Sequence, residues 1–509
     1  MQLFEVTLLL LAVAVALMQV ARHLRVPYPA LLALVGGCVA ALPFAPHLNI
    51  EPRLALALFV APAVMDTAFE LPPRELLRNW VPLMSLAVLL VLATTAAVAW
   101  AGVGFAGLPL AAAVALGAIV APPDAAAAAA VLSEFELPRR AMAILQGESL
   151  LNDAVALLAF GIAVSVAMSP GAALGPLLPR LLIAVPGGAL LGVAVGLFGT
   201  WILRRMAGTV SAIITQFLFT FGTWILADHL SLSPILAVVG LAAVAAREMP
   251  KRMTARDRIN TNAVWITVTF VLNVLAFLLM GLQARGILSQ LQGSELTHAL
   301  AFAGLVLAAV ILVRFAWVMS YGAIIRRFLP PNRPAPSARV GILVSWCGMR
   351  GLVTLATAFA LPPEFPKRDV IVLSAFTVVL GSLILQGFTI RPLIFWLKIA
   401  RDETLDDEVA AARDAMLAAA LAVLDGAHGT VVEEVRAELS AQRSASAGRE
   451  RPNTESDELR RRALGAERAL LEDWREDGRV TDDVYHHLEE ELDRAELAVE
   501  PPGASWPEA

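Results

Sequence analysis

Gly147-Glu148-Ser149-Leu150-Leu151-Asn152-Asp153-Ala154-Val155-Ala156-Leu157 is the stretch around which the rest of the chain is organised. It lies inside a long apolar segment, yet it carries two carboxylates, an amide and a hydroxyl. At helical spacing Glu148 and Asn152 lie one turn apart, as do Ser149 and Asp153, so these groups form one polar flank. Ionisable groups at membrane depth face the protein interior and usually mark an ion or proton path. The stretch therefore indicates a small oxygen-rich site for a hard monovalent cation or a proton; the alternative is a polar patch that only packs helices together.

The composition is that of a polytopic membrane protein. Of 509 residues, 58% are apolar, and apolar runs long enough to span a bilayer occur thirteen times. The first run lacks a basic flank and a cleavage site, which predicts a membrane span rather than a removable signal peptide. The two cysteines, Cys38 and Cys347, give neither a disulfide framework nor zinc spacing. The predicted spans are residues 3–21, 28–44, 54–70, 80–101, 108–132, 139–167, 177–203, 211–229, 232–246, 259–283, 296–322, 339–360 and 369–398.

The charge balance divides the chain in two. Residues 1–400 contain 16 acidic and 26 basic side chains, whereas residues 401–509 contain 28 acidic and 13 basic ones. This predicts a basic membrane domain, residues 1–400, followed by an acidic helical tail, residues 401–509. Four amphipathic helices are expected in the tail, with a linker at Ser444–Asn453 between the second and the third. Their predicted ranges are Glu408–Leu424, Val431–Gln442, Asp457–Trp474 and Asp482–Leu497.

Loop charges predict the orientation in the membrane. Lysine and arginine residues, such as Arg204-Arg205 and Arg326-Arg327, concentrate in the loops on one side of the predicted spans. Since positively charged loops stay on the cytoplasmic side, the N-terminus is expected outside the cell membrane. Thirteen spans then place the tail in the cytoplasm.

Two of the predicted spans are interrupted by residues that break helices. Ala121-Pro122-Pro123-Asp124 removes two backbone donors in the middle of the fifth span. Gly348-Met349-Arg350-Gly351 places two glycines around a charge in the twelfth. If spans 1–6 and 8–13 are inverted repeats around the seventh, the two breaks fall at corresponding positions. Paired interruptions of this kind indicate the binding site of a transporter.

Several motifs resemble those of one transporter family. Besides Glu148–Asp153, they are Pro62 followed by Asp66, Phe270–Leu282, Arg314 before Phe315-Ala316-Trp317, Gly348–Gly351 and Leu385-Gln386-Gly387. In this order and spacing the chain resembles the monovalent cation:proton antiporter-1 family, the sodium/proton exchangers, over residues 1–398. The resemblance implies a homodimer of all-helical protomers with thirteen membrane helices, in which two broken helices cross beside the sixth and a mobile core gives alternating access. Such a protein is not an enzyme.

The resemblance and the electrostatics together assign candidate roles. Asp153 is the expected carrier, because one buried carboxylate binds either a proton or a dehydrated monovalent cation. Asn152 stands where electrogenic relatives carry a second aspartate, which predicts electroneutral one-for-one exchange. Ser149, Asn152 and Asp124 are candidate ligands, and Asp66 is equally compatible with a role as a ligand and with a position near a helix end. Glu148 and Arg350 are expected to form a structural ion pair, because an unpaired buried charge is strongly destabilising; Arg314 is a second buried cation whose partner the sequence does not indicate.

The fifth span departs from the family pattern. Many members have Thr-Asp-Pro at the break, whereas this chain has Pro122-Pro123-Asp124 and lacks the threonine hydroxyl. The backbone carbonyl of Pro122 is a candidate substitute ligand. Asp124 is expected to cap the N-terminus of the following half-helix. The departure leaves the choice between Na⁺ and K⁺ open.

Other classes of function remain as alternatives. A K⁺/H⁺ antiporter would use the same scaffold, with Li⁺ as a further substrate cation. A cation channel would need a repeated pore motif, and a non-transporting sensor would explain the tail but not the paired breaks. A membrane enzyme would need a nucleophile with its base or a set of metal ligands, which the sequence does not offer. No cofactor and no nucleic-acid partner are expected. The expected partners are the lipid bilayer, the cation and the proton.

Overall fold

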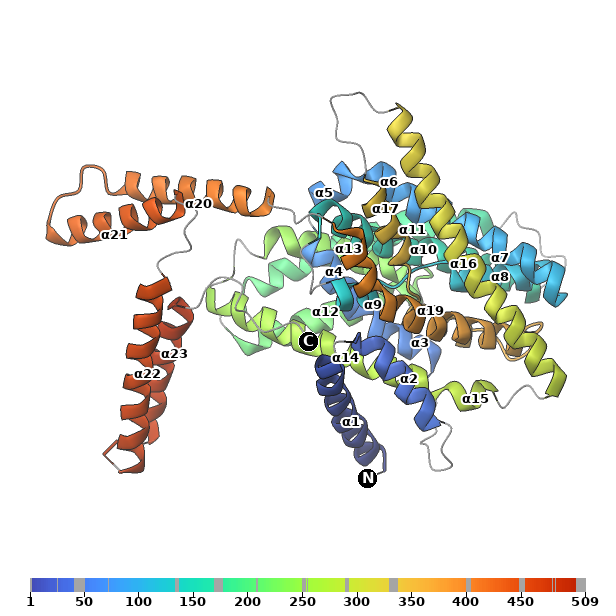
Figure 1. The fold of residues 1–509 in the computed structure, drawn as a ribbon, viewed down its shortest axis with the longest axis horizontal. Helices are drawn as coiled ribbons and strands as arrows, with labels where there is room; N and C mark the ends of the chain where they lie inside the picture. Colours follow the sequence, from blue (N-terminus) through green and yellow to red (C-terminus); the bar gives the residue numbers. More distant parts are fainter. Residues whose placement is uncertain are drawn as a thin grey trace. The chain divides into compact units, whose positions relative to one another are not determined.

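The computed structural model is helical throughout the part of the chain that it describes (Figure 1). The described residues are 2–24, 26–40, 51–71, 73–132, 137–168, 177–206, 209–249, 253, 255–288, 293–328, 337–399, 404–447, 454–477, 479–480 and 482–499. They fall into two compact units, Met1–Ala400 and Arg401–Ala509.

The first unit contains the apolar helices. Two of the long segments change helix type without interruption: α3, η1 and α4 follow one another, as do α6, η2 and α7, where η1 and η2 are π-helical. The bounds are α1 Gln2–Leu24, α2 Tyr28–Ala40, α3 Pro52–Ala55, η1 Leu56–Val60, α4 Ala61–Glu70, α5 Pro73–Arg78, α6 Trp80–Met84, η2 Ser85–Leu90, α7 Val91–Ala106, α8 Leu110–Val120, α9 Ala125–Leu132, α10 Arg139–Met168, α11 Leu177–Leu203, α12 Val210–His229, α13 Pro234–Glu248, α14 Ala255–Leu282, α15 Ala284–Leu288, α16 Gly293–Phe328, α17 Ala338–Trp346, α18 Leu352–Phe359 and α19 Arg368–Leu397.

Each of the thirteen predicted spans overlaps one helix or a run of helices in this unit. Within the described residues, seven helices are long and apolar enough to cross a membrane, and three shorter apolar helices accompany them. The chain is therefore an all-helical, multi-pass membrane protein. The number of thirteen crossings and the inverted repeat stay predictions.

Both predicted helix breaks are present. α8 ends at Val120 and α9 begins at Ala125, so Pro122 and Pro123 occupy the gap that their missing N–H groups create. α17 ends at Trp346 and α18 begins at Leu352, with Gly348–Gly351 between them. The backbone N–H of Asp124 donates to the carbonyl of Met349 at 2.7 Å. The two breaks therefore lie directly against each other.

Close backbone packing fixes α14, which later forms one wall of the candidate site. α14 lies against α2, where Gly36 and Gly281 face each other. A Cβ atom added to Gly281 would lie 2.3 Å from the carbonyl oxygen of Ala33, so only glycine permits this approach. Small residues at a crossing let membrane helices approach until their backbones touch.

The second unit consists of two helical hairpins, α20 Thr404–Val423 with α21 Thr430–Ala447, and α22 Thr454–Glu476 with α23 Asp482–Val499. Arg443 of α21 hydrogen-bonds to Asp414 of α20 at 2.7 and 3.2 Å, and this contact lowers the pKa of the Asp414 carboxyl. Arg468 of α22 contacts Asp493 and Glu496 of α23. The predicted linker was placed too early, because α21 continues through Ser444 to Ala447; its remaining residues, 448–453, lie outside the described part.

Candidate functional site

Asp153 lies near the middle of α10 and borders a cavity of about 60 Å³. Its side chain is 6% exposed. The cavity has room for a small cation that keeps part of its water. Its walls come from η1, α4, α10, α14, α18 and the break after α8. They are formed by Phe59, Val60, Ala63, Val64, Thr67, Asp124, Ser149, Leu150, Asp153, Asn273, Ala276, Phe277, Leu352 and Val353.

Asp124 connects the two broken helices through its side chain. Oδ1 accepts a hydrogen bond from the N–H of Ala127 in the first turn of α9, at 3.4 Å. Oδ2 accepts from the N–H of Leu352, the first residue of α18, at 3.3 Å. Two helix N-termini, each carrying a partial positive charge, thus point at one carboxylate. The predicted capping of one half-helix is present, and the same carboxylate caps a second one.

Ser149 lies between α10 and the first break. Its hydroxyl donates to the carbonyl of Pro123 at 3.5 Å. Pro123 borders a smaller neighbouring cavity, and the predicted Pro122 is buried beside it. Ser149 and Asp124 border both the Asp153 cavity and this smaller one.

Asn152 and Asp66 do not line the Asp153 cavity. Asn152 is fully buried, and within the described chain its amide forms no hydrogen bond. Ala156, one turn further along α10, packs against Val91 and Ala121, which places this side of the helix toward α7 and α8. Asp66 is half-buried on α4, next to Thr67, which does line the cavity.

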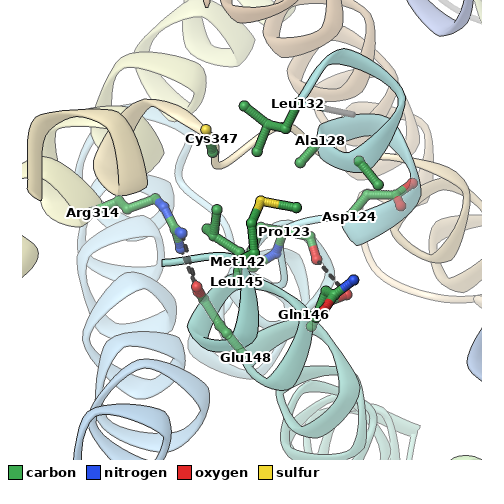
Figure 2. A pocket seen from close by; sticks show the side chains of 12 residues that line it. Pro123, Asp124, Ala128, Leu132, Met142, Leu145, Gln146, Glu148, Arg314 and Cys347 are labelled. Atoms are coloured by element: carbon green, nitrogen blue, oxygen red, sulfur yellow. Dashed lines mark hydrogen bonds and ion pairs between the residues drawn. The ribbon is translucent and has the colours of Figure 1, made fainter. Parts of the chain in front are cut away.

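The buried ion pair is Glu148 with Arg314, not Glu148 with Arg350 as predicted. Arg314 Nη2 donates to Glu148 Oε2 at 2.9 Å, and Nη1 donates to Oε1, so the contact is bidentate (Figure 2). Both side chains are 1% exposed. Arg314 also donates to the carbonyl of Val344 through Nε at 3.3 Å and Nη2 at 3.1 Å. This geometry compensates two buried charges with each other.

Arg350 instead satisfies backbone carbonyls at the breaks. Nε donates to Val120 at 2.9 Å, Nη2 donates to Ala121 at 3.0 Å, and Nη1 donates to Gly348. Its own N–H donates to the hydroxyl of Ser382 on α19 at 2.9 Å. The last carbonyls of a helix lack partners inside the helix and carry partial negative charge, so a guanidinium at the end of α8 is favourable. This role explains why Arg350 needs no carboxylate.

The smaller cavity, of about 20 Å³, lies beside the ion pair (Figure 2). Met142, Leu145 and Gln146 border it from α10, Ala128 and Leu132 from α9, and Cys347 follows α17. It is mostly apolar, so its composition favours helix packing around the pair over ion binding.

The charges of the site thus divide into compensated and uncompensated ones. Glu148 is paired with Arg314, and Asp124 is held by two helix N-termini. Among the described residues, no hydrogen bond or ion pair to the carboxylate of Asp153 is present. Asp153 is therefore the buried carboxylate at this site for which the described residues supply no compensating charge.

Comparison with known proteins gives the family. The sequence model of the family described as sodium/hydrogen exchanger, transmembrane, matches residues 8–396. The chain belongs to the sodium/hydrogen exchanger family. It is therefore a membrane transporter and not an enzyme.

Relatives and solved structures agree with this assignment. The exchanger is 33% identical to an uncharacterized Na⁺/H⁺ exchanger of Mycobacterium tuberculosis over 430 residues, 81% of this chain and 77% of the relative. It is 30% identical to a sodium, potassium, lithium and rubidium/H⁺ antiporter of Bacillus pumilus, over 83% of this chain and 66% of that protein. The fold matches the sodium proton antiporter of Methanocaldococcus jannaschii with a TM-score of 0.59 and 18% identity, covering 78% of this chain and 99% of the other.

Sequence reasoning missed Thr67 and Asn273 as residues of the exchanger's cavity. Asn273 was part of the quoted Phe270–Leu282 motif, and a carboxamide in the middle of an apolar span is a usable signal. Thr67 carries no comparable signal, because threonine is common in membrane helices. The position of Ser382 against Arg350 likewise depends on packing that the sequence does not display.

Proposed function

We propose that this exchanger transports a monovalent cation in exchange for a proton, with Asp153 as the carrier that binds one or the other. The observation that carries the proposal is the Asp153 carboxylate, buried beside a cavity and without a compensating protein group among the described residues. A buried carboxylate in this position is stable only when a proton or a cation neutralises it. Loading with one species therefore requires release of the other.

Ser149, Asn152, Asp124 and Asp66 are candidate accessory groups around the ion. Ser149 and Asp124 line the cavity, so either can reach an ion bound at Asp153 directly or through water. Asn152 and Asp66 lie outside the cavity wall and would reach the ion only after a rearrangement. The carbonyl of Pro122 stays a candidate ligand, and that of Pro123, which accepts a hydrogen bond from Ser149, is a second one.

Na⁺ is the cation that we favour, and K⁺ is the second candidate. The names of the Mycobacterium tuberculosis relative and of the Methanocaldococcus jannaschii antiporter support Na⁺. The name of the Bacillus pumilus relative, which specifies sodium, potassium, lithium and rubidium, supports a site that accepts several alkali cations. With one carrier carboxylate, and with Asn152 beside it instead of a second acid, exchange is one cation for one proton and electroneutral.

The arrangement in the cell follows the same proposal. The exchanger is a homodimer in the cell membrane, with thirteen crossings built from inverted repeats, the N-terminus outside and the acidic tail in the cytoplasm. The concentration of arginine and lysine on one side of the spans supports the orientation. Alternating access exposes the Asp153 cavity to one side at a time.

The decisive experiment is proton-coupled flux in proteoliposomes. Asp153→Asn should abolish Na⁺-driven proton movement while the protein still elutes as a folded species. Asp228→Asn, which removes an exposed carboxylate on α12, is the matched control and should exchange at the rate of the unmodified protein. Exchange by Asp153→Asn would remove Asp153 from the carrier role. Cation flux that does not depend on the proton gradient would indicate a channel. An absence of flux in the unmodified protein would indicate a sensor.

A further inference from the structure

A set of buried and half-buried polar side chains lies along α12 and α14. Within the described chain, four of them have a side-chain atom with no hydrogen-bond partner: Gln216 (Nε2), Thr223, Thr261 and Thr269. Gln216, Thr223 and Thr269 are 5%, 1% and 7% exposed. Together with Trp265 and Asn273 we call them the α12–α14 polar stripe.

The stripe has a regular spacing along α14. Thr261, Trp265, Thr269 and Asn273 follow one another at intervals of four residues, so each lies one turn beyond the last on a path that winds slowly around the helix. At 1.5 Å per residue, the path from Thr261 to Asn273 is about 18 Å long. Asp257 lies one turn before Thr261, between Arg256 and Arg258 at the start of α14.

The far end of the stripe opens on the carrier site. Asn273 borders the cavity that contains Asp153. Midway along the stripe, Trp265 Nε1 donates to Gln216 Oε1 at 3.0 Å, and its ring stacks on Phe217 at 4.3 Å between centroids. This contact joins α12 to α14. It leaves the amide nitrogen of Gln216 without a hydrogen-bond acceptor among the described residues.

The unused hydroxyls are not the usual threonines of membrane helices. Thr220 on α12 and Thr267 on α14 donate to the carbonyl one turn earlier, at 3.0 and 2.8 Å, as threonine commonly does in a helix. Thr223, Thr261 and Thr269 do not use this bond. Buried polar atoms are almost always hydrogen-bonded, to protein or to ordered water, so these three hydroxyls and the Gln216 amide are candidate positions for bound water.

We propose that the α12–α14 polar stripe binds a chain of water molecules that carries protons between Asp153 and the side of the membrane on which α14 begins. The inference rests on the proposed function, because it gives the proton of that exchange a route of its own. In the state in which Asp153 has access to this side, a proton that leaves its carboxyl passes to the nearest water, each water gives a proton to the next, and the last one gives it to the bulk. The proposed topology makes this side cytoplasmic.

The chemistry of the stripe favours a proton over the metal cation. A travelling alkali cation needs several oxygen ligands at every point to replace its water, whereas the stripe offers about one hydroxyl or amide per turn. The stacked rings of Trp265 and Phe217 also occupy space beside the path. A single file of water needs only the few polar partners that are present.

Hydration of the stripe can be tested without transport. Hydroxyl radicals generated by an X-ray pulse modify buried side chains that lie next to bound water. The expected result for the unmodified protein in proteoliposomes is modification of Trp265, which is 8% exposed, whereas Met280, which is 3% exposed on the same helix but lies outside the stripe, stays largely unmodified. A Trp265 that is as unreactive as Met280 would overturn the proposal.

Transport by matched variants tests the role of the water. Thr269→Val keeps the shape and removes the hydroxyl, Thr269→Ser keeps the hydroxyl, and Thr267→Val is the control, since Thr267 is exposed on the same helix. At saturating Na⁺, turnover should fall several-fold in Thr269→Val and stay near normal in the other two, with the half-saturating Na⁺ concentration unchanged in all three. Equal turnover of Val and Ser variants would overturn the proposal, as would a parallel change in half-saturation, because the stripe would then conduct the cation.

Failure of this inference is distinguishable from failure of the proposed function. If the unmodified protein exchanges Na⁺ for H⁺ and depends on Asp153, but Thr269→Val behaves as Thr269→Ser does, only the water route is wrong. If the unmodified protein shows no exchange, the proposed function is wrong and the footprint of Trp265 still decides whether the stripe is hydrated.

Discussion

At the scale of single residues, the site contains three carboxylates in three different environments, of which those of Glu148 and Asp153 are buried and that of Asp124 is half-buried. Glu148 is neutralised by a guanidinium, Asp124 is stabilised by backbone N–H groups, and Asp153 borders a cavity. Burial alone therefore does not separate the carrier from the structural acids. What separates them is whether the protein already supplies the compensating charge.

Competition at Asp153 is the first expected consequence. Since one carboxylate binds either a proton or a cation, lowering the pH should raise the apparent KM for Na⁺ with little change in the maximal rate. At high pH turnover should fall, because fewer protons arrive to displace the cation. The measurement is the initial rate of exchange over a grid of pH and Na⁺ concentration. The pH optimum should move to lower values as Na⁺ rises, and an optimum indifferent to Na⁺ would contradict a shared site.

The ion pair gives a second expectation. Glu148→Gln or Arg314→Leu alone leaves a buried charge without its partner and should destabilise the protein by about 3–5 kcal/mol. The double variant should recover a substantial part of that loss. A double-mutant cycle on thermal stability in detergent measures the coupling. The same cycle with Glu148→Gln and Arg350→Leu is the control and should show clearly weaker coupling, because Arg350 bonds to carbonyls; equal coupling in both cycles would contradict the assignment.

At the scale of elements, the two broken helices are where sequence reasoning was most effective. Pro122 and Pro123 lack the donors that a continuous helix requires, and Gly348 and Gly351 flank a charge, so both interruptions were predictable from local chemistry. The partner of Glu148 was not. Arg314 and Arg350 both lie within apolar spans, and only the packing of α10 and α16 against α17 brings one guanidinium onto the carboxylate.

Substitutions of Asp124 test whether its carboxylate stabilises the N-termini of α9 and α18. Asp124→Ala removes the caps of both α9 and α18, and at about 1 kcal/mol per cap it should lower the unfolding temperature measurably. Asp124→Asn keeps an acceptor oxygen for one of the two N–H groups and should cost less. Thermal unfolding in detergent, compared with the exposed control Asp228→Asn, measures both. Equal stability of Asp124→Ala and the control would show that the two caps contribute nothing.

At the scale of the whole molecule, the composition was sufficient to predict the class of protein, a multi-pass membrane protein. The apolar runs, the basic first 400 residues and the acidic remainder follow from the sequence, and the family follows from similarity over residues 8–396. The cavity could not be predicted in the same way, since its walls come from η1, α4, α10, α14 and α18, which are far apart in the chain. Spacing within one helix shows a polar flank but not what lies opposite to it.

Charge balance over one transport cycle is the expectation at this scale. With one carrier carboxylate per protomer, Na⁺-driven proton movement in tight proteoliposomes should not respond to a membrane potential set with valinomycin and K⁺. A clear acceleration by voltage would mean that a second carboxylate also moves charge. The same measurement on Asp124→Asn would then show whether Asp124 is that carboxylate. Because K⁺ is a candidate substrate, the same measurement is repeated with Li⁺ as the driving cation.

The bonds between the two breaks have a mechanical consequence. Asp124 joins α9 to α18 through its carboxylate and through its own N–H, and Arg350 joins the loop before α18 to the end of α8. Any displacement of one broken helix relative to the other would have to rupture all of these bonds within a low-dielectric interior. We therefore expect the half-helices around the two breaks to move together, with any sliding at the opposite wall of the cavity, where α4 meets α10 and α14 meets α18 largely through apolar side chains.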